Sequence, residues 1–203
     1  RILSALREIF THPIAFGYTI GAGLISGAFL GYLNSAQQIF QEQYELGTKF
    51  PLYFVIIALA IGGASFLNGR LVLRYGMRNL TTWSVSTLVS LSMIFCLIAL
   101  LLDGNPPLLA LMIYLMTSFF CVGILFGNLN SLAMEPLGHI AGVGAAVVGS
   151  LSTFISVTLG FLIGQSYNST ILPLVGGFAV LSTLSMVIMR WAEKGKPVSS
   201  FSS

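Results

Sequence analysis

The stretch NGRLVLRYGMR, residues 68–78, interrupts an otherwise apolar part of this 203-residue chain. It holds Arg70, Arg74 and Arg78, three of the nine Lys and Arg residues. Residues 50–69, before the first arginine, and 79–102, after the last, contain no Lys, Arg, Asp or Glu. About 20 apolar residues cross the roughly 30 Å hydrocarbon core of a bilayer as a helix. We therefore interpret the stretch as a charged loop between two membrane-spanning helices.

The composition of the whole chain supports a membrane protein. Hydrophobic residues make up 56% and charged residues 7% of the sequence, whereas soluble domains carry about 25% charged residues. The mean hydropathy is +0.92. The apolar runs are continuous and do not alternate as the strands of a membrane β-barrel do. No basic cluster is interleaved with aromatic residues, so we expect no nucleic-acid partner.

Charges and turn residues divide the chain into six apolar segments, each long enough to span a bilayer. The segments are 13–39, 50–67, 80–102, 108–134, 143–167 and 170–189. The sequence therefore predicts an all-α membrane domain of six transmembrane helices over residues 13–190. Residues 1–12 would form a linker before it, and residues 191–203 a tail after it. Apolar residues of the linker follow helical spacing, which favours either a short interfacial helix or a frayed terminus.

The basic residues are distributed unevenly between the two ends of these helices. Eight of the nine fall on one side, and Lys49 falls on the other. The eight are Arg1, Arg7, Arg70, Arg74, Arg78, Arg190, Lys194 and Lys196. Because cytoplasmic loops of membrane proteins carry the excess of Lys and Arg, both termini are expected in the cytoplasm.

The arginine stretch also has a spacing that resembles a known signature. Transporters of the major facilitator superfamily carry, between the second and third helices of each half, Gly, a variable stretch, Asp, Arg, a variable residue, Gly and basic residues. Leu73 stands here where the acid would be. Glycines would allow a tight turn, and arginines would pair with carboxylates or helix ends when this face closes. The resemblance implies a cytoplasmic gating motif of Gly69, Arg70, Arg74, Gly76 and Arg78. The alternative is a loop that only fixes orientation.

Two further stretches resemble one group within that superfamily. FGNLNSLAMEPLGHIAG (126–142) and YLNSAQQIFQEQYEL (32–46) are similar to connections in the second halves of Bcr/CflA drug-resistance transporters. The resemblance implies the C-terminal six helices of a twelve-helix protein, built as two inverted three-helix repeats.

The resemblance also implies a function. The chain would be half of a secondary active transporter of the bacterial inner membrane that exports hydrophobic small molecules by alternating access, coupled to protons. Its partners would be an N-terminal six-helix half, the bilayer, a small-molecule substrate and protons. Two alternatives stay open: a structural six-helix module without its own substrate site, and a uniporter or importer of a small metabolite.

Small residues at intervals of four predict close helix contacts, because small side chains let membrane helices approach each other. Such ridges occur in the first, fourth and fifth segments. The glycines concerned are Gly23, Gly27, Gly31, Gly123, Gly127, Gly160 and Gly164.

Polar residues within the first and fourth segments are candidates for a substrate cavity. In the superfamily these two helices of each half line the central cavity. A buried amide or hydroxyl needs a partner or water, so these residues mark either a cavity or hydrogen bonds between helices. The candidates are Asn34, Gln37, Tyr114, Thr117, Ser118 and Cys121.

No Asp, Glu, Lys, Arg or His lies in the middle of any segment. A proton-binding carboxylate would therefore have to lie in another part of the transporter. His12 and His139 lie outside the segments, which argues against an intramembrane serine protease. We expect no catalytic residue, no enzyme activity, no metal and no cofactor.

Overall fold

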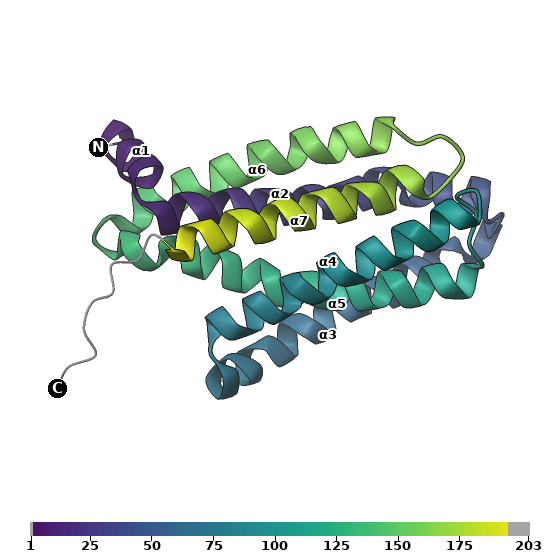
Figure 1. Cartoon of the computed structure of the whole chain (residues 1–203), viewed down its shortest axis with the longest axis horizontal. Coiled ribbons are helices and arrows are strands. Elements are labelled where there is room, and N and C mark those ends of the chain that lie inside the picture. The colour runs from purple at the N-terminus through teal and green to yellow at the C-terminus, as the bar shows by residue number, and fades with distance from the viewer. Residues whose placement is uncertain (1, 195–203) are drawn as a thin grey trace.

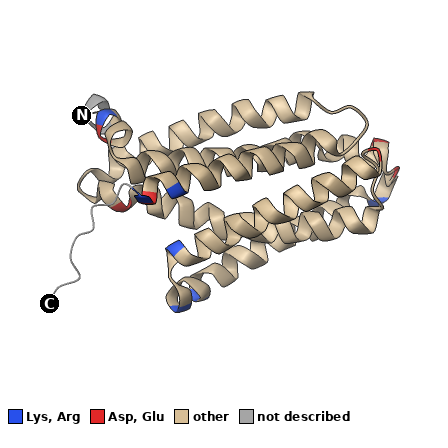
Figure 2. Cartoon of the chain, viewed as in Figure 1, with Lys and Arg blue, Asp and Glu red and all other residues tan. Residues whose placement is uncertain are grey.

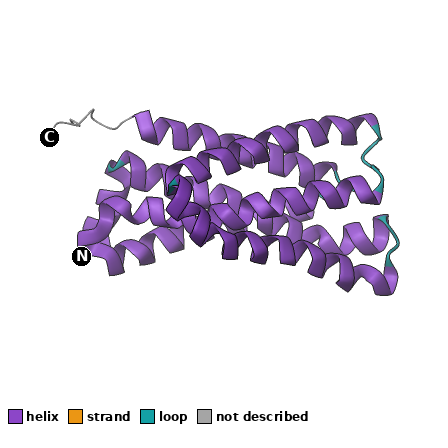
Figure 3. Ribbon diagram, turned by 90° about the horizontal axis from the view of Figure 1, so that it is seen from below, coloured by secondary structure: helices purple, strands orange, loops and turns teal. Residues whose placement is uncertain are grey.

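The structure is a computed structural model that describes the backbone of residues 2–194 and the side chains of residues 6–194. Arg1 and the predicted tail from residue 195 onward lie outside the described residues. The described chain is helical, with short connections (Figure 3). The helices are α1 (Ile2–Thr11), α2 (Pro13–Gln37), the π-helical η1 (Gln38–Gln43), η2 (Gly47–Lys49), α3 (Phe50–Tyr75), α4 (Met77–Leu101), α5 (Leu108–Met134), η3 (Glu135–Ile140), α6 (Ala141–Gln165) and α7 (Leu172–Lys194).

The long helices are apolar enough to cross a membrane. Five helical stretches meet this condition by length and composition. The longest, Leu108–Gln165, has 58 residues, and a straight helix of that length would extend about 87 Å, far beyond the roughly 30 Å core. It consists of α5 and α6, joined by the 3-10 turn η3, in which Pro136 lies in the first turn. The domain therefore has six transmembrane helices, α2 to α7.

The helix contacts have a two-fold pattern. α2 packs mainly on α6 and α7, and α5 packs mainly on α3 and α4. α2 also contacts α5, and α4 contacts α7. Exchanging α2 with α5, α3 with α6 and α4 with α7 leaves this pattern unchanged. Three spans per repeat place the second repeat upside down relative to the first, so the fold is two inverted three-helix repeats (Figure 1).

The charged residues lie at the two ends of the bundle (Figure 2). We call the end at which α1 lies and α7 finishes the basic end. Its described basic residues are Arg7, Arg70, Arg74, Arg78, Arg190 and Lys194. The opposite end has Lys49 among Glu42, Glu45 and Asp103. The uncharged middle matches what a hydrocarbon environment requires.

The predicted loop at residues 68–78 is wrong. α3 continues through Arg70 and Arg74 to Tyr75, and α4 begins at Met77. The connection is Gly76 alone, with φ of 80° and ψ of 149°. The charged residues do not end α3, because arginine is a good helix former and the helix is unbroken up to Gly76. α7 likewise continues beyond the predicted boundary at residue 190, to Lys194.

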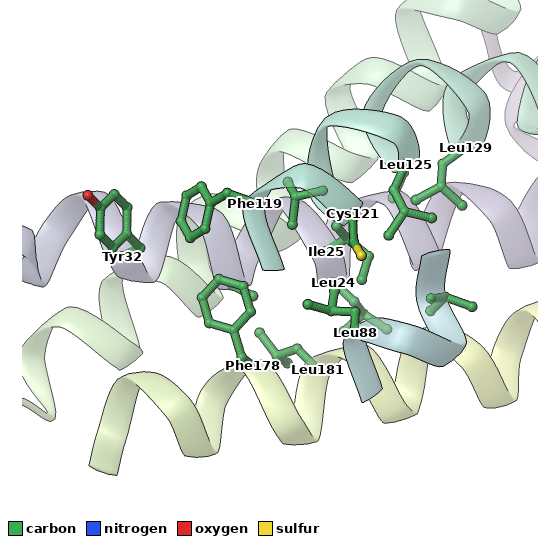
Figure 4. Packing of buried hydrophobic residues seen from close by; sticks show 14 of the residues in the cluster. Leu24, Ile25, Tyr32, Leu88, Phe119, Cys121, Leu125, Leu129, Phe178 and Leu181 are labelled. Atoms are coloured by element: carbon green, nitrogen blue, oxygen red, sulfur yellow. The ribbon is translucent and has the colours of Figure 1, made fainter. Parts of the chain in front are cut away.

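The core lies between α2, α4, α5 and α7 and contains many aromatic side chains. The Phe119 ring contacts Tyr32 edge-on, with centroids 4.6 Å apart, and lies 5.8 Å from Phe178 (Figure 4). α3 is peripheral, since Ile57 and Ala64 are its only buried residues. Within α1, Ile9 is buried and Leu6 is partly buried, while Phe10 is exposed. That pattern fits an amphipathic helix lying against the bundle.

Candidate functional site

Glycines of α2 receive large side chains of α6. A Cβ atom added to Gly23 would lie 2.9 Å from the Cβ of Ile155, and one added to Gly31 would lie 2.7 Å from Cγ2 of Ile163. Gly27 has a similar contact with Leu159, at 3.0 Å. No real Cβ fits at such distances without a shift, so α2 and α6 approach as closely as their backbones allow.

Glycines of α6 receive side chains of α2 in return. A Cβ on Gly160 would lie 2.5 Å from the Cβ of Leu30, and one on Gly164 would lie 2.7 Å from the Cβ of Asn34. The two helices therefore interlock in both directions. This reciprocal packing makes α2 and α6 one mechanical unit.

The two glycines of α5 differ. A Cβ on Gly123 would lie 2.6 Å from the carbonyl oxygen of Ile61 in α3. Gly127 is exposed, and a Cβ there would meet only the amide nitrogen of Asn68, at 3.9 Å. The packing role predicted for Gly127 is therefore wrong. Near this level α3 and α5 are joined by polar side chains instead: Asn68 and Asn128 exchange two hydrogen bonds of 2.9 and 3.0 Å.

The polar face predicted on α5 points into the core. Tyr114 is 1% exposed; its hydroxyl is 2.9 Å from that of Ser92, and its ring stacks on Phe95 with centroids 4.4 Å apart. Ser118 and Cys121 are also buried. Figure 4 shows Cys121 beside Leu24, Ile25 and Leu88, from α2 and α4.

This placement corrects the cavity expectation for Tyr114, Ser118 and Cys121. α2 and α4 pack on α5, and the Phe178 ring of α7 lies edge-on to Tyr114, so these three buried side chains line no open surface of the domain. Tyr114 instead follows the alternative left open by the sequence, a hydrogen bond between helices. Periodicity showed which residues share a face, but it did not show which helix covers that face.

The other candidates lie on exposed surfaces. Thr117 is exposed, and its hydroxyl donates to the carbonyl oxygen of Ile113 at 2.9 Å. Asn34 and Gln37 are exposed on α2. They belong to a face of α2 that α6 contacts at the Cβ atoms of Leu30 and Asn34 and that is otherwise partly uncovered. We call it the open face, and its residues are Ser26, Phe29, Leu30, Leu33, Asn34 and Gln37.

An aromatic contact borders the open face. Phe29 lies edge-on against Phe126 of α5, with centroids 5.3 Å apart, and both rings are partly buried. Together the open face and Phe126 present aliphatic, aromatic and amide groups. Such a mixture suits an apolar ligand with a few hydrogen-bonding groups.

At the basic end, Arg78 joins three helices. Its guanidinium pairs with Glu135, which follows α5, and with Glu193 of α7, where Nη1 and Oε1 are 3.3 Å apart. The Tyr18 hydroxyl of α2 donates to the same Glu193 oxygen at 2.7 Å. We call these four residues the Arg78 cluster. It ties α2, α4, α5 and α7 together at one end of the bundle.

Sequence reasoning missed the partners of Arg78. No motif in the sequence singled out Glu135, Tyr18 or Glu193. A usable signal was present, because Glu8, Glu135 and Glu193 are the acids that the predicted topology places among the many basic residues of that end. Glu8 has another partner: its Oε1 is 2.9 Å from Nε2 of His139, which links α1 to η3.

Within the described part of the chain, the other members of the predicted gating motif make no such ties. Arg70 and Arg74 are exposed, with their guanidinium carbons 5.7 and 5.3 Å from the rings of Phe66 and Tyr75. Gly69 lies within α3, and a Cβ there would meet nothing within 4 Å. The tight-turn role predicted for both glycines therefore falls to Gly76 alone.

At the opposite end, the connections are bonded to one another. Gln43 donates to the carbonyl oxygen of Gly104 at 3.0 Å, and the backbone N–H of Ile171 donates to the same oxygen at 3.1 Å. The Tyr44 hydroxyl donates to the carbonyl oxygen of Pro106 at 2.6 Å. Burial raises the pKa of Tyr44 to about 12, so this hydroxyl keeps its proton at physiological pH. These bonds fix η1 and the two loops relative to each other.

Comparison with known proteins agrees with this architecture. The family model described as Major Facilitator Superfamily matches residues 1–161. The chain is 26% identical over 156 residues to the uncharacterized MFS-type transporter YdgK of Bacillus subtilis (strain 168), covering 76% of this chain and 38% of that protein. It is 30% identical over 189 residues to Multidrug resistance protein D of Escherichia coli (strain K12), covering 87% and 42%.

The chain thus spans less than half the length of both relatives. No solved structure matches it. The family model covers most of the chain and agrees with six apolar helices in two inverted repeats. This chain belongs to the major facilitator superfamily, a family of membrane transporters.

Proposed function

We propose that this chain is the C-terminal half of a secondary active transporter that exports hydrophobic small molecules by alternating access. The observation that carries the proposal is the open face of α2, which offers exposed amides beside half-buried aromatic rings. Support for export of drug-like compounds comes from the relative named Multidrug resistance protein D. In this proposal Asn34, Gln37 and Thr117 contact substrate, while the buried Tyr114, Ser118 and Cys121 hold α5 in place.

A second six-helix half would cover the surfaces that this domain leaves apolar and exposed. Phe66 of α3 and Phe154 of α6 are each 73% exposed, and Leu59 of α3 is 67% exposed. In a bilayer such residues face lipid or another helix bundle. The shares of 38% and 42% covered in the two relatives leave room for such a half.

The basic end would face the cytoplasm of a bacterial cell. Every described Lys and Arg except Lys49 lies at that end, which is the bias expected of cytoplasmic segments. The Arg78 cluster would then hold the cytoplasmic ends of four helices in fixed register while the two halves rock. Coupling to protons would require a titratable group within the membrane, and the described residues place all their carboxylates at the ends of the bundle.

The test is substrate transport by the intact protein with single alanine substitutions on the open face. Efflux of the fluorescent cation ethidium from energised cells is measured for Asn34→Ala and Gln37→Ala. Asn79→Ala serves as control, since Asn79 is an exposed amide of α4 at the basic end of the bundle. We expect efflux to fall about threefold or more for the first two variants and to stay unchanged for the control.

The alternatives predict other outcomes. A structural module without a substrate site predicts equal efflux for all three variants at equal expression. An importer predicts that ethidium accumulates faster in cells that express the protein than in cells that lack it. Either result would refute the proposal.

A further inference from the structure

A groove of about 300 Å³ opens between α2, α4 and α7 at the basic end. Val85 of α4 and Met186 and Met189 of α7 form its apolar wall. Methionine side chains are flexible and polarizable, and they adapt to irregular apolar partners. The groove is distinct from the open face, since the two share no residue: Tyr18 is the α2 residue that lines the groove.

Two cations stand at the rim of the groove. Arg190 and Lys194 line it, and both are exposed on the last turns of α7, one helical turn apart. Neither forms an ion pair with another residue in the described range 2–194. Glu193 also lines the groove, but its carboxylate already bonds Arg78 and Tyr18. The rim therefore attracts negative charge.

The tryptophans mark the level at which the groove meets the membrane surface. The two tryptophans of the chain, Trp83 and Trp191, directly follow the groove residues Thr82 and Arg190. Each is 53% exposed. Tryptophan is enriched where the hydrocarbon meets the lipid headgroups. The cations of the rim therefore lie at headgroup level, with the apolar wall toward the hydrocarbon.

We propose that this groove binds one anionic phospholipid. Its phosphate lies between the Arg190 guanidinium and the Lys194 ammonium group, and an acyl chain runs along Val85, Met186 and Met189. A guanidinium binds phosphate oxygens in a bidentate manner, and a neighbouring ammonium adds a point charge. Basic pockets between membrane helices are suited to anionic headgroups for this reason. The lipid would bridge α4 and α7 beside the Arg78 cluster, independently of what the transporter carries.

The test is native mass spectrometry of the intact, delipidated protein titrated with dioleoylphosphatidylglycerol or with dioleoylphosphatidylethanolamine. We expect one tightly bound phosphatidylglycerol, held about tenfold more tightly than phosphatidylethanolamine. The double variant Arg190→Gln, Lys194→Gln should lose this preference. The matched control Arg70→Gln, Arg74→Gln removes equal charge from the exposed end of α3 and should bind phosphatidylglycerol as the unmodified protein does.

A second variant separates the groove from the charge. Thr82→Phe keeps both cations but places a large side chain in the groove that Thr82 lines, so this variant should also lose the tightly bound lipid. Each variant is first shown to be monodisperse by size-exclusion chromatography. Equal affinity for the two lipids in the unmodified protein would overturn the proposal. So would full phosphatidylglycerol binding by Thr82→Phe, or equal losses in the two double variants.

Discussion

Arg70, Arg74 and Arg78 share one spacing in the sequence but have two different kinds of surroundings. The first two lie on the last turns of α3, beside aromatic rings and open to solvent. Arg78 lies across the Gly76 turn, on α4, and meets two carboxylates. The turn at Gly76 thus separates the arginine that forms ion pairs between helices from the two that do not. The predicted gating motif included all three arginines and did not distinguish them.

The first prediction compares Arg78→Gln with Arg74→Gln. Arg78→Gln leaves Glu135 and Glu193 without their shared cation, so we expect about 1 kcal/mol of lost stability at this partly exposed site. That corresponds to a fall of about 3 °C in the melting temperature. Arg74→Gln should leave the melting temperature unchanged. Thermal unfolding of the purified protein in detergent measures both, and equal shifts would show that the cluster contributes nothing.

The second prediction concerns Tyr114, which the structure moves from a cavity to the core. Tyr114→Phe loses one hydrogen bond to Ser92 but keeps the ring on Phe95, so it should cost about 1 kcal/mol. Tyr114→Ala leaves a cavity and should cost about 3–5 kcal/mol, with poor expression. Expression yield and melting temperature check this order. Normal expression of Tyr114→Ala with an altered substrate range would restore the cavity assignment.

At the scale of helices, boundaries were harder to predict than spans. Each of the six predicted segments corresponds to one helix, because long apolar runs have no other stable form in a bilayer. The turn after α3 was misplaced, since Arg70 and Arg74 continue a helix as readily as they form a loop. The helix that packs on a given face was not predictable either. Gly123 and Gly127 are four residues apart on α5, but of the two only Gly123 lies in close contact with α3.

The third prediction uses the two glycines of the arginine stretch. Gly76 has a φ of 80° and a ψ of 149°, a region that essentially only glycine occupies, so Gly76→Ala should cost about 1–3 kcal/mol. Gly69 lies in a helix with free space around it, so Gly69→Ala should stabilise the protein by about 0.5–1 kcal/mol. Melting temperatures that move in opposite directions would confirm the one-residue turn. A lower melting temperature in both variants would instead support a loop over residues 68–78.

The fourth prediction tests the interlocked contact between α2 and α6. Gly31→Ala places a methyl group 2.7 Å from Ile163, and we expect a cost of about 1–3 kcal/mol from overpacking. Gly127→Ala has room and should be neutral or slightly stabilising. Expression and melting temperature of the two variants give the comparison. Equal tolerance of both alanines would mean that α2 and α6 can separate without cost.

At the scale of the whole molecule, the two ends of the bundle are held by different chemistry. The basic end has ion pairs around Arg78, whereas the opposite end has hydrogen bonds centred on the Gly104 carbonyl. The architecture followed from the resemblance and from hydropathy. The contacts at the two ends could not be predicted in this way. Gln43 and Ile171, for example, both donate to the Gly104 carbonyl oxygen, although the three residues are far apart in the sequence and follow no periodic pattern. Both ends being tied favours movement of this domain as one body.

The last prediction concerns proton coupling, and it follows from where the carboxylates lie. The six acids of the chain are Glu8, Glu42, Glu45, Asp103, Glu135 and Glu193, and the structure places each at an end of the bundle. A coupling group must bind a proton inside the membrane with an affinity that differs between the two states of the transporter. We therefore expect each single amide substitution to leave proton-driven export by the intact protein measurable.

The Arg78 cluster adds a distinction among these six. Glu135→Gln and Glu193→Gln remove partners of Arg78, so they should slow export by loosening the basic end. Their ratio of protons to substrate should stay unchanged, as it should for Glu42→Gln, which serves as control because Glu42 is exposed at the opposite end. Proton flux and substrate flux recorded together in proteoliposomes separate rate from coupling. If one of these substitutions abolished proton flux while substrate still moved, the coupling site would lie in this domain and the assignment to another part of the transporter would fail.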